Sequence, residues 1–211
     1  MGRRLYFNFD HRKATQALNY FAITSGGKIN KMKALKLVFL VDRYHLRKYG
    51  RLVTNDNYLA MKHGPVPSIT RDIIESNDYL DDAIKYYSQE YIEPVDRWTI
   101  ASLNQPDTSV FSETDIEALN FVWRIFGHYD QFQLRDITHT YPEWRKQKKY
   151  VDTGSCAQMN IFDFLLDPTE QVDGSLQLSK TDLNLYPLDD DDRDIRTETL
   201  QERSLVDSLW K

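Results

Sequence analysis

The chain has 211 residues and a net charge of −5, and 41% of its residues are hydrophobic and 13% aromatic. This length suits one domain with an appendage or at most two small domains, and the apolar share is enough for a sizeable core. The single cysteine, Cys156, excludes an internal disulfide framework and fits a reducing cytoplasm. No apolar run reaches about 18 residues and residues 1–13 lack an apolar segment, so we expect neither a membrane span nor a signal peptide.

The charge is unevenly placed along the chain. Residues 171–211 contain 10 acidic and 5 basic residues, which leaves 22 of each sign in residues 1–170. A neutral body with an acidic tail argues against nucleic acid as a partner, because duplex binding depends on basic residues that neutralise phosphates. The basic run Arg145–Lys149 beside Trp144 could bind nucleic acid by charge and stacking, but it is more typical of a solvated helix end.

Two helices are predicted in the first part of the chain. Residues 12–23 place apolar side chains on one face, and Ser25-Gly26-Gly27 ends this helix. Asn30 can cap the next helix, which runs to Gly50. Because residues 37–41 are apolar on every side, we expect protein to surround this second helix as a buried central element.

Short strands follow. Residues 57–62 suit a strand, and the corner from His63 to Ser68 contains two prolines that restrict the backbone and cannot donate hydrogen bonds. A helix is expected to begin at Ser68. The alternating stretches 86–93 and 97–101 are predicted to pair as a hairpin around Pro94, which would give a small antiparallel sheet.

The second half is predicted to be helical up to Pro168. Ser112 and Asp115 resemble a capping box that opens a helix ending at Gly127. A shorter helix is expected over 131–139, a further turn begins at Tyr141, and a last apolar helix covers 159–166. The predicted fold is therefore mainly α: a compact helical bundle around a buried central helix, with a small antiparallel β-hairpin or sheet.

Residues 1–168 are predicted to form the domain and residues 169–211 an acidic C-terminal tail. The four consecutive carboxylates Asp189–Asp192 repel one another and resist packing. We expect this tail to be extended or partly disordered.

One carboxylate, Asp42, lies on the apolar stripe of the second helix. Its burial is costly unless it is hydrogen-bonded or paired. We favour a structural role, in which it accepts hydrogen bonds from the following loop or from Arg43, His45 or His63. The alternative is a general base with a shifted pKa, acting with His45 or His63 in a small enzyme.

Motifs for other chemistry are missing. The histidines at 11, 45, 63, 128 and 139 and the lone cysteine lack metal-binding spacing. The sequence has no phosphate-binding loop, no dinucleotide fingerprint and no nucleophile elbow. We therefore predict no catalytic residues, no metal, no cofactor and no enzymatic activity.

Three segments together resemble the Panacea domain, also called the SocA-like antitoxin domain. These are KLVFLVDRYHLRKYGR (Lys36–Arg51), NYLAMKHGPVPS (Asn57–Ser68) and ITHTYPEW (Ile137–Trp144). The resemblance covers roughly Gln16 to Phe164, and Phe39 stands where the family often has tyrosine. It implies a mostly helical, cytoplasmic antitoxin from a bacterial or phage toxin–antitoxin pair, which neutralises a cognate toxin by direct protein–protein binding.

The motif residues are assigned to the structural core: Asp42, His45, His63, Gly64, Pro65 and Pro67. Aromatic and arginine side chains dominate interface energetics. We therefore predict partner contacts at Tyr44, Arg47, Tyr49, Trp144 and Arg145, and expect the acidic tail to engage or cover a basic toxin surface. The alternative function is an adaptor that delivers a bound partner to a protease, which implies a protease or chaperone contact.

Overall fold

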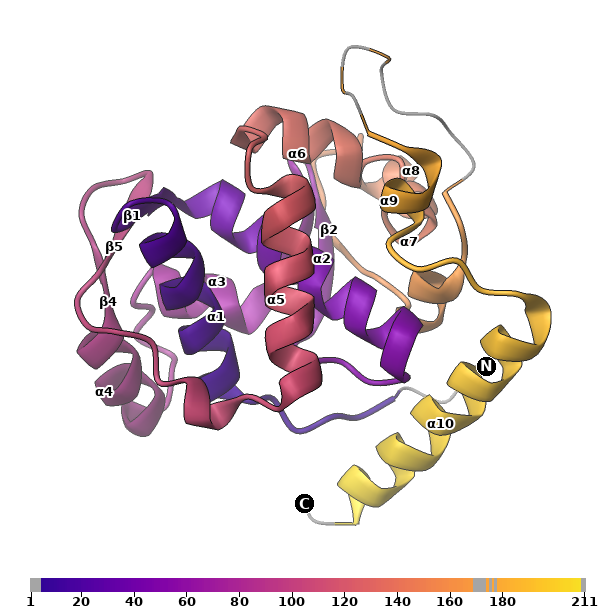
Figure 1. The fold of residues 1–211 in the computed structure, drawn as a ribbon, viewed down its shortest axis with the longest axis horizontal. Helices are drawn as coiled ribbons and strands as arrows, with labels where there is room; N and C mark the ends of the chain where they lie inside the picture. The colour runs from indigo at the N-terminus through magenta and orange to yellow at the C-terminus, as the bar shows by residue number, and fades with distance from the viewer. Residues whose placement is uncertain (1–4, 169–173, 175, 177, 210–211) are drawn as a thin grey trace.

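The computed structural model describes residues 5–168, 174, 176 and 178–209 (Figure 1). The described residues are mainly helical, which confirms the predicted fold class at the level of a mainly α chain with small antiparallel sheets. The α-helices are α1 (His11–Thr24), α2 (Lys31–Tyr49), α3 (Ser68–Ile74), α4 (Asp82–Tyr91), α5 (Glu113–Phe126), α6 (Gln131–Thr138), α7 (Pro142–Arg145), α8 (Lys148–Val151), α9 (Lys180–Asn184) and α10 (Asp190–Ser208).

The strands form two antiparallel sheets within the described ranges. Their bounds are β1 (Lys28–Asn30), β2 (Tyr58–Met61), β3 (Gly64–Pro67), β4 (Ile92–Pro94), β5 (Thr99–Ser102) and β6 (Ala157–Gln158). One sheet has the order β1-β5-β4 and the other the order β3-β2-β6. Short 3-10 helices, η1 (Thr108–Val110) and η2 (Ile161–Leu165), complete the fold.

Helix α2 begins and ends as its sequence predicts. The Asn30 side chain accepts a hydrogen bond from the Lys33 amide, and Gly50 ends the helix with a φ of 75°, which favours glycine. Every residue from Ala34 to Arg47 is buried. Helices α1, α5 and α6 pack on α2, and α5 crosses in front of it in Figure 1.

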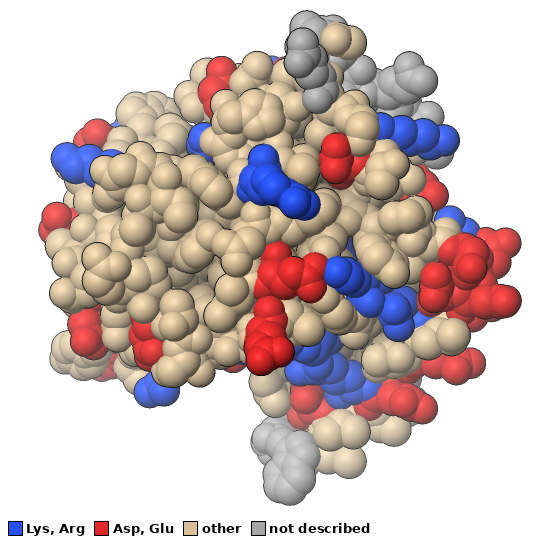
Figure 2. Space-filling view, viewed as in Figure 1, with Lys and Arg blue, Asp and Glu red and all other residues tan. Residues whose placement is uncertain are grey.

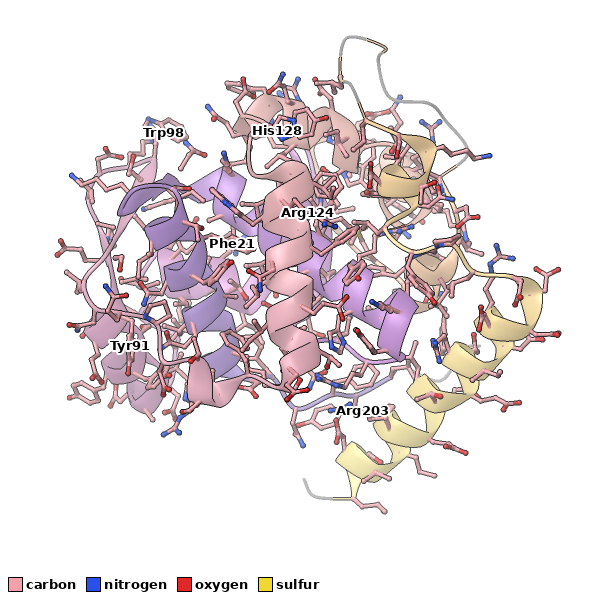
Figure 3. The ribbon with its side chains drawn as sticks, viewed as in Figure 1. Phe21, Tyr91, Trp98, Arg124, His128 and Arg203 are labelled. Carbon is pink, nitrogen blue, oxygen red and sulfur yellow. The ribbon has the colours of Figure 1, made fainter. Side chains whose placement is uncertain are left out.

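Aromatic side chains tie α1 to α5. Phe21 is fully buried and points from α1 toward α5, where it stacks on Trp123 with ring centroids 6.1 Å apart (Figure 3). Ser112 and Asp115 form the predicted capping box at the start of α5, so that prediction is confirmed. The ring contact fixes α5 against α1, and the capping box sets the residue at which α5 begins.

The prediction of a strand over 86–91 is wrong. These residues belong to α4, because the Asp81 side chain accepts a hydrogen bond from the Ala83 amide and starts a helix there. Tyr87 and Tyr91 then lie one helical turn apart, with ring centroids at 5.1 Å. Only Ile92–Pro94 forms the strand that pairs with β5.

Two further segments differ from their predicted form. The corner that follows His63 is itself a strand, β3, in which Pro65 pairs with Ala60 and Pro67 with Tyr58. The last apolar stretch, predicted as a helix over 159–166, forms the short 3-10 helix η2. The Asn160 side chain caps the start of η2 by accepting a hydrogen bond from the Phe162 amide.

Part of the predicted tail is helical and not extended, over residues 180–184 and 190–208. The Asp189 side chain accepts a hydrogen bond from the Asp192 amide, and the acidic first turn of α10 lies at the positive end of the helix dipole. This interaction offsets the repulsion among the carboxylates. Residues 169–173, 175, 177 and 210–211 of the tail lie outside the described residues.

Helix α10 packs on the body with one face (Figure 1). Arg196 donates to the carbonyl oxygens of Arg47 at 3.2 Å and Lys48 at 2.8 Å, which are free at the C-terminal end of α2. Leu200 is fully buried. The Tyr6 amide donates to Ser204 Oγ at 2.8 Å. Residues 5–10, which precede α1 and which we call the N-terminal arm, are therefore attached to the same helix.

Candidate functional site

Asp42 is fully buried and both of its carboxylate oxygens accept hydrogen bonds. The Val53 and Thr54 amides donate to Oδ1 at 2.6 and 2.9 Å, and the Thr54 and Tyr58 hydroxyls donate to Oδ2. Burial raises the pKa of Asp42, and these hydrogen bonds act in the opposite direction. The carboxylate thus fastens the loop after α2 and strand β2 to the helix, which is the structural arrangement that we favoured.

Asp56 performs a similar task for α3, whose first residue follows a proline that offers no side-chain cap. It accepts hydrogen bonds from the Ile69 amide at 3.0 Å and from the Thr70 amide and hydroxyl at 2.8 and 2.7 Å. Burial raises the pKa of Asp56 to about 6. A distant carboxylate therefore caps this helix, which local sequence patterns do not reveal.

A pocket of about 260 Å³ lies beside this loop. Its apolar walls come from the N-terminal arm and η2, including Phe7 and Phe162, and its polar lining includes Asn57 and Gln158. Asp56 borders the pocket, but its oxygens are already occupied by α3. The pocket therefore presents the amide groups of Asn57 and Gln158, and Tyr58 in its lining already donates its hydroxyl to Asp42.

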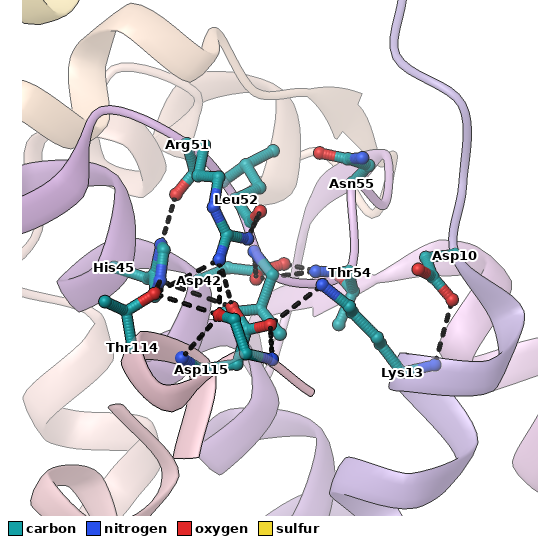
Figure 4. A network of polar contacts seen from close by, with 12 residues as sticks. Asp10, Lys13, Asp42, His45, Arg51, Leu52, Thr54, Asn55, Thr114 and Asp115 are labelled. Atoms are coloured by element: carbon teal, nitrogen blue, oxygen red, sulfur yellow. Dashed lines mark hydrogen bonds and ion pairs between the residues drawn. The ribbon is translucent and has the colours of Figure 1, made fainter. Parts of the chain in front are cut away.

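His45 belongs to a polar network that joins α1, α2 and α5 (Figure 4). Its Nδ1 lies 2.9 Å from the Arg51 carbonyl oxygen, which can only accept, so Nδ1 carries the proton. Its Nε2 then accepts from the Thr114 hydroxyl at 3.0 Å. Burial lowers the pKa of His45 to about 4, so it is neutral near pH 7 and serves as a link between two elements.

Asp115 is the centre of this network. Lys13 Nζ lies 2.8 Å from its Oδ2 and Arg51 Nη2 lies 2.7 Å from its Oδ1. Burial alone would raise the pKa of Asp115, but Lys13, the Ser112 amide and Arg51 outweigh it and lower the pKa. The network holds the N-terminal ends of α1 and α5 against the C-terminal end of α2.

The Gly-Pro corner is held by a residue that sequence reasoning missed. Lys36 is 1% exposed and its Nζ donates to the Pro65 carbonyl oxygen at 2.6 Å. Gly64 has a φ of 96°, and a Cβ there would lie 2.9 Å from both Lys36 Nζ and Thr138 Oγ1, so only glycine fits. Lys36 lies in the same apolar helix as Asp42, and that position was the signal that could have identified it.

His63 is exposed, and it forms no hydrogen bond within the described part of the chain. Its assignment to the structural core is therefore wrong. Among the described residues, the hydrogen bonds to the Asp42 carboxylate come from Val53, Thr54 and Tyr58, so the structure does not pair Asp42 with His63 as the enzyme hypothesis requires. Gly64, Pro65 and Pro67 are buried, as core residues should be.

His139 and Trp144 form the other wall of this corner. Their rings stack with centroids 3.7 Å apart, and Trp144 Nε1 donates to the Met61 carbonyl oxygen at 3.0 Å. Burial, with a contribution from the Lys36 charge, lowers the pKa of His139 to about 4. Both rings therefore pack against β2 and its turn.

Lys36 predicts a measurable pH dependence. Burial lowers its pKa from 10.5 to about 7, so between these values the unfolded chain binds more protons than the folded chain. We expect the free energy of unfolding to rise with pH over this window, by on the order of 1 kcal/mol per pH unit. Urea denaturation of wild type and Lys36→Met across the window measures the rise, which the variant should lack. The exposed Lys62→Met should keep it, and an undiminished rise in Lys36→Met would contradict this account.

Two arginines of α2 hold η2, the residues just after it and Tyr186. Arg43 Nε lies 2.8 Å from Glu143 Oε1 with both side chains fully buried, and its Nη2 donates to the Leu166 carbonyl oxygen at 2.6 Å. Arg47 donates to the carbonyl oxygens of Tyr186 at 2.8 Å and Phe164 at 3.1 Å. These carbonyl groups include ones left free at the ends of short helices, which explains why arginines are buried there.

The predicted partner-contact residues are largely engaged within the chain. Tyr44, Arg47 and Trp144 are at most 5% exposed, whereas Tyr49 and Arg145 are half-buried. Tyr44 and Tyr49 donate to Glu117, which Lys48 also contacts. Desolvation raises the pKa of Glu117, but these three partners lower it to about 2. The buried side chains have no free surface in this conformation, and a contact role for these residues stays a prediction.

Two further features of the described residues concern metal binding and membrane insertion. No three His, Cys, Asp or Glu side chains of the described ranges are grouped as a metal site. None of the helices in those ranges combines the length and apolar character that a membrane crossing needs.

Comparison with known protein families shows the family to which the chain belongs. Residues 35–145 match the family model described as Antitoxin SocA-like, Panacea domain. No curated protein and no solved structure matches the chain. The matched range runs from α2 to α7 and contains Asp42, the Gly-Pro corner and the Arg43–Glu143 pair. It spans more than half of the chain, which confirms the predicted resemblance: the chain belongs to the SocA-like antitoxin family with a Panacea domain.

Proposed function

We propose that this protein is the antitoxin of a toxin–antitoxin pair and neutralises its toxin by direct protein–protein binding. The observation that supports this proposal is the family match over residues 35–145. In this proposal the protein acts in the cytoplasm, and α2 is the central helix of a rigid scaffold.

The geometry of the motif residues is compatible with a binding protein. Asp42, His45 and Lys36 are buried and each is used in a hydrogen bond that joins two elements of the fold. Such groups preserve one conformation and present no reacting atom at the surface. A preformed surface binds with a smaller entropic cost, which suits a protein whose task is tight sequestration.

Growth rescue tests the proposal. Each of the two genes that flank this one is expressed from an inducible promoter, alone and together with this chain. We expect one neighbour to stop growth by itself, co-expression to restore growth, and the two proteins to elute together in gel filtration. An unrelated helical protein at the same level is the control. Two harmless neighbours, or growth arrest that persists although both proteins are folded and abundant, would contradict the proposal.

A further inference from the structure

The arginines of helix α10 and most of its exposed carboxylates lie on different faces, and Asp207 is the acidic residue that accepts a hydrogen bond from the Asn8 amide. Arg193 and Arg196 lie on the side that contacts the body, where they donate to Leu188 and to the last carbonyl groups of α2. Figure 3 also shows Arg203 on the side of α10 nearer the body. The exposed acidic residues lie elsewhere on the helix: Asp190, Asp191, Asp194, Glu198 and Glu202. Figure 2 shows acidic side chains gathered over the part of the molecule where α10 lies.

The outward face also exposes large aliphatic side chains. Ile195 is 53% exposed, Leu205 56%, Val206 53% and Leu209 74%. Such side chains are unusual on the exposed face of a helix that is otherwise strongly polar. The face that packs on the body already has its own apolar contact, the fully buried Leu200. The apolar area is therefore surplus to what fixes α10 to the body.

The spacing of these residues indicates what the face can bind. Ile195, Glu198, Glu202, Leu205 and Leu209 follow one another at alternating steps of three and four residues, which is the spacing of the a and d positions of a coiled coil. We call these five residues the outward seam. A seam of this kind packs against another helix, and two glutamates within it need basic residues opposite them.

A second copy of the same helix is a poor occupant. Antiparallel pairing would place Glu198 and Glu202 near the same glutamates of the other copy, and like charges in such positions destabilise a pair. A basic amphipathic helix instead pairs its lysines or arginines with the glutamates and its aliphatic side chains with the ends of the seam.

The seam is held in place before any partner arrives. Arg196 fixes α10 to the C-terminal end of α2. The Ser204 hydroxyl accepts a hydrogen bond from the Tyr6 amide, on the side of α10 opposite to the seam. Because α10 is already folded and fixed to the body, it does not have to become ordered when the partner binds, so less conformational entropy is lost.

We propose that the outward seam of α10 docks a basic amphipathic helix of the toxin. This inference rests on the proposed antitoxin function, and it adds the surface and the chemistry of the partner segment. Acidic and aliphatic side chains contribute together, so binding weakens both with added salt and with loss of the aliphatic groups.

Two pairs of substitutions test the seam in the full-length protein. Glu198→Lys with Glu202→Lys reverses its charge, and Leu205→Ser with Leu209→Ser removes its aliphatic end. Gln201→Lys with Ser208→Lys is the matched control, because it adds two lysines to exposed positions of α10 outside the seam. All six side chains are exposed, so the thermal midpoints should stay close to that of the wild type.

Binding is measured to the neighbour-gene protein that stops growth and to a synthetic helix with leucines at heptad a and d positions and lysines beside them. We expect both seam variants to lose about 10-fold or more in affinity for both probes, and to lose growth rescue. The control variant should keep the wild-type affinity and the growth rescue. A peptide with glutamates in place of the lysines should not bind the wild type.

The outcomes separate the two proposals. Seam variants that bind and neutralise the toxin like the wild type would overturn the seam and leave the antitoxin function standing. If neither neighbour is a toxin, the antitoxin function fails and the lysine peptide alone decides whether the seam takes a basic helix. A dimer in sedimentation that Leu205→Ser with Leu209→Ser abolishes, together with no peptide binding, would assign the seam to a second copy and overturn the proposal.

Discussion

Replacing Asp42 with alanine is expected to lower the free energy of unfolding by about 3–5 kcal/mol. The change leaves two buried amides and the Tyr58 hydroxyl without their acceptor. For a chain of this size the thermal midpoint should fall by roughly 6–20 °C, since each kcal/mol shifts it by about 2–4 °C. Circular dichroism during heating measures the shift.

The controls for this prediction separate structure from chemistry. Asp152 is exposed, so Asp152→Ala should change stability by no more than about 0.5 kcal/mol. Asp42→Asn keeps the shape but replaces one acceptor oxygen by a donor group, so it should also be destabilised. If Asp42→Asn kept the wild-type midpoint and lost its biological effect, Asp42 would have a reactive role instead.

Glu143→Leu is expected to lower the free energy of unfolding by about 3–5 kcal/mol as well, because it leaves the Arg43 guanidinium buried without its carboxylate. Removing the charge as well, in Arg43→Met with Glu143→Leu, should recover part of the loss. Recovery is incomplete because Arg43 also donates to the Leu166 carbonyl oxygen. Urea denaturation of the two single variants and the double variant completes a thermodynamic cycle.

The sign of the coupling energy tests this reasoning. A double variant that is more stable than Glu143→Leu alone confirms that the unpaired charge dominates the cost. Strictly additive losses would mean that the two side chains act independently. Arg124→Met with Glu90→Leu is a control with the same pair of side-chain changes at two exposed positions.

Local features of the fold were predictable because they depend on neighbours in sequence. The caps at Asn30 and Ser112 and the stop at Gly50 satisfy backbone groups within a few residues. The role of Asp42 was also accessible, since a carboxylate inside an apolar helix must find donors and the next loop is the nearest source.

Other features depend on partners far away in sequence. Arg43 and Glu143 are 100 positions apart, and no pattern in either segment shows that they meet. Helix α4 was mistaken for a strand because residues 86–93 were interpreted as an alternating stretch, and the cap at Asp81 was overlooked. The charge of α10 was judged as a sum, whereas Arg196 lies toward the body and exposed carboxylates such as Glu198 and Glu202 lie on the outward side of the helix.

The bond between the Tyr6 amide and the Ser204 hydroxyl has a consequence for how the molecule is made. These residues are 198 positions apart, so on the ribosome the residues around Tyr6 are made long before the Ser204 hydroxyl exists. Long-range contacts of this kind close late, because a large loop must be ordered first. The elements between these two residues are therefore made before the Tyr6 amide and α10 come together, and α10 reaches its docked position after the body that it packs on.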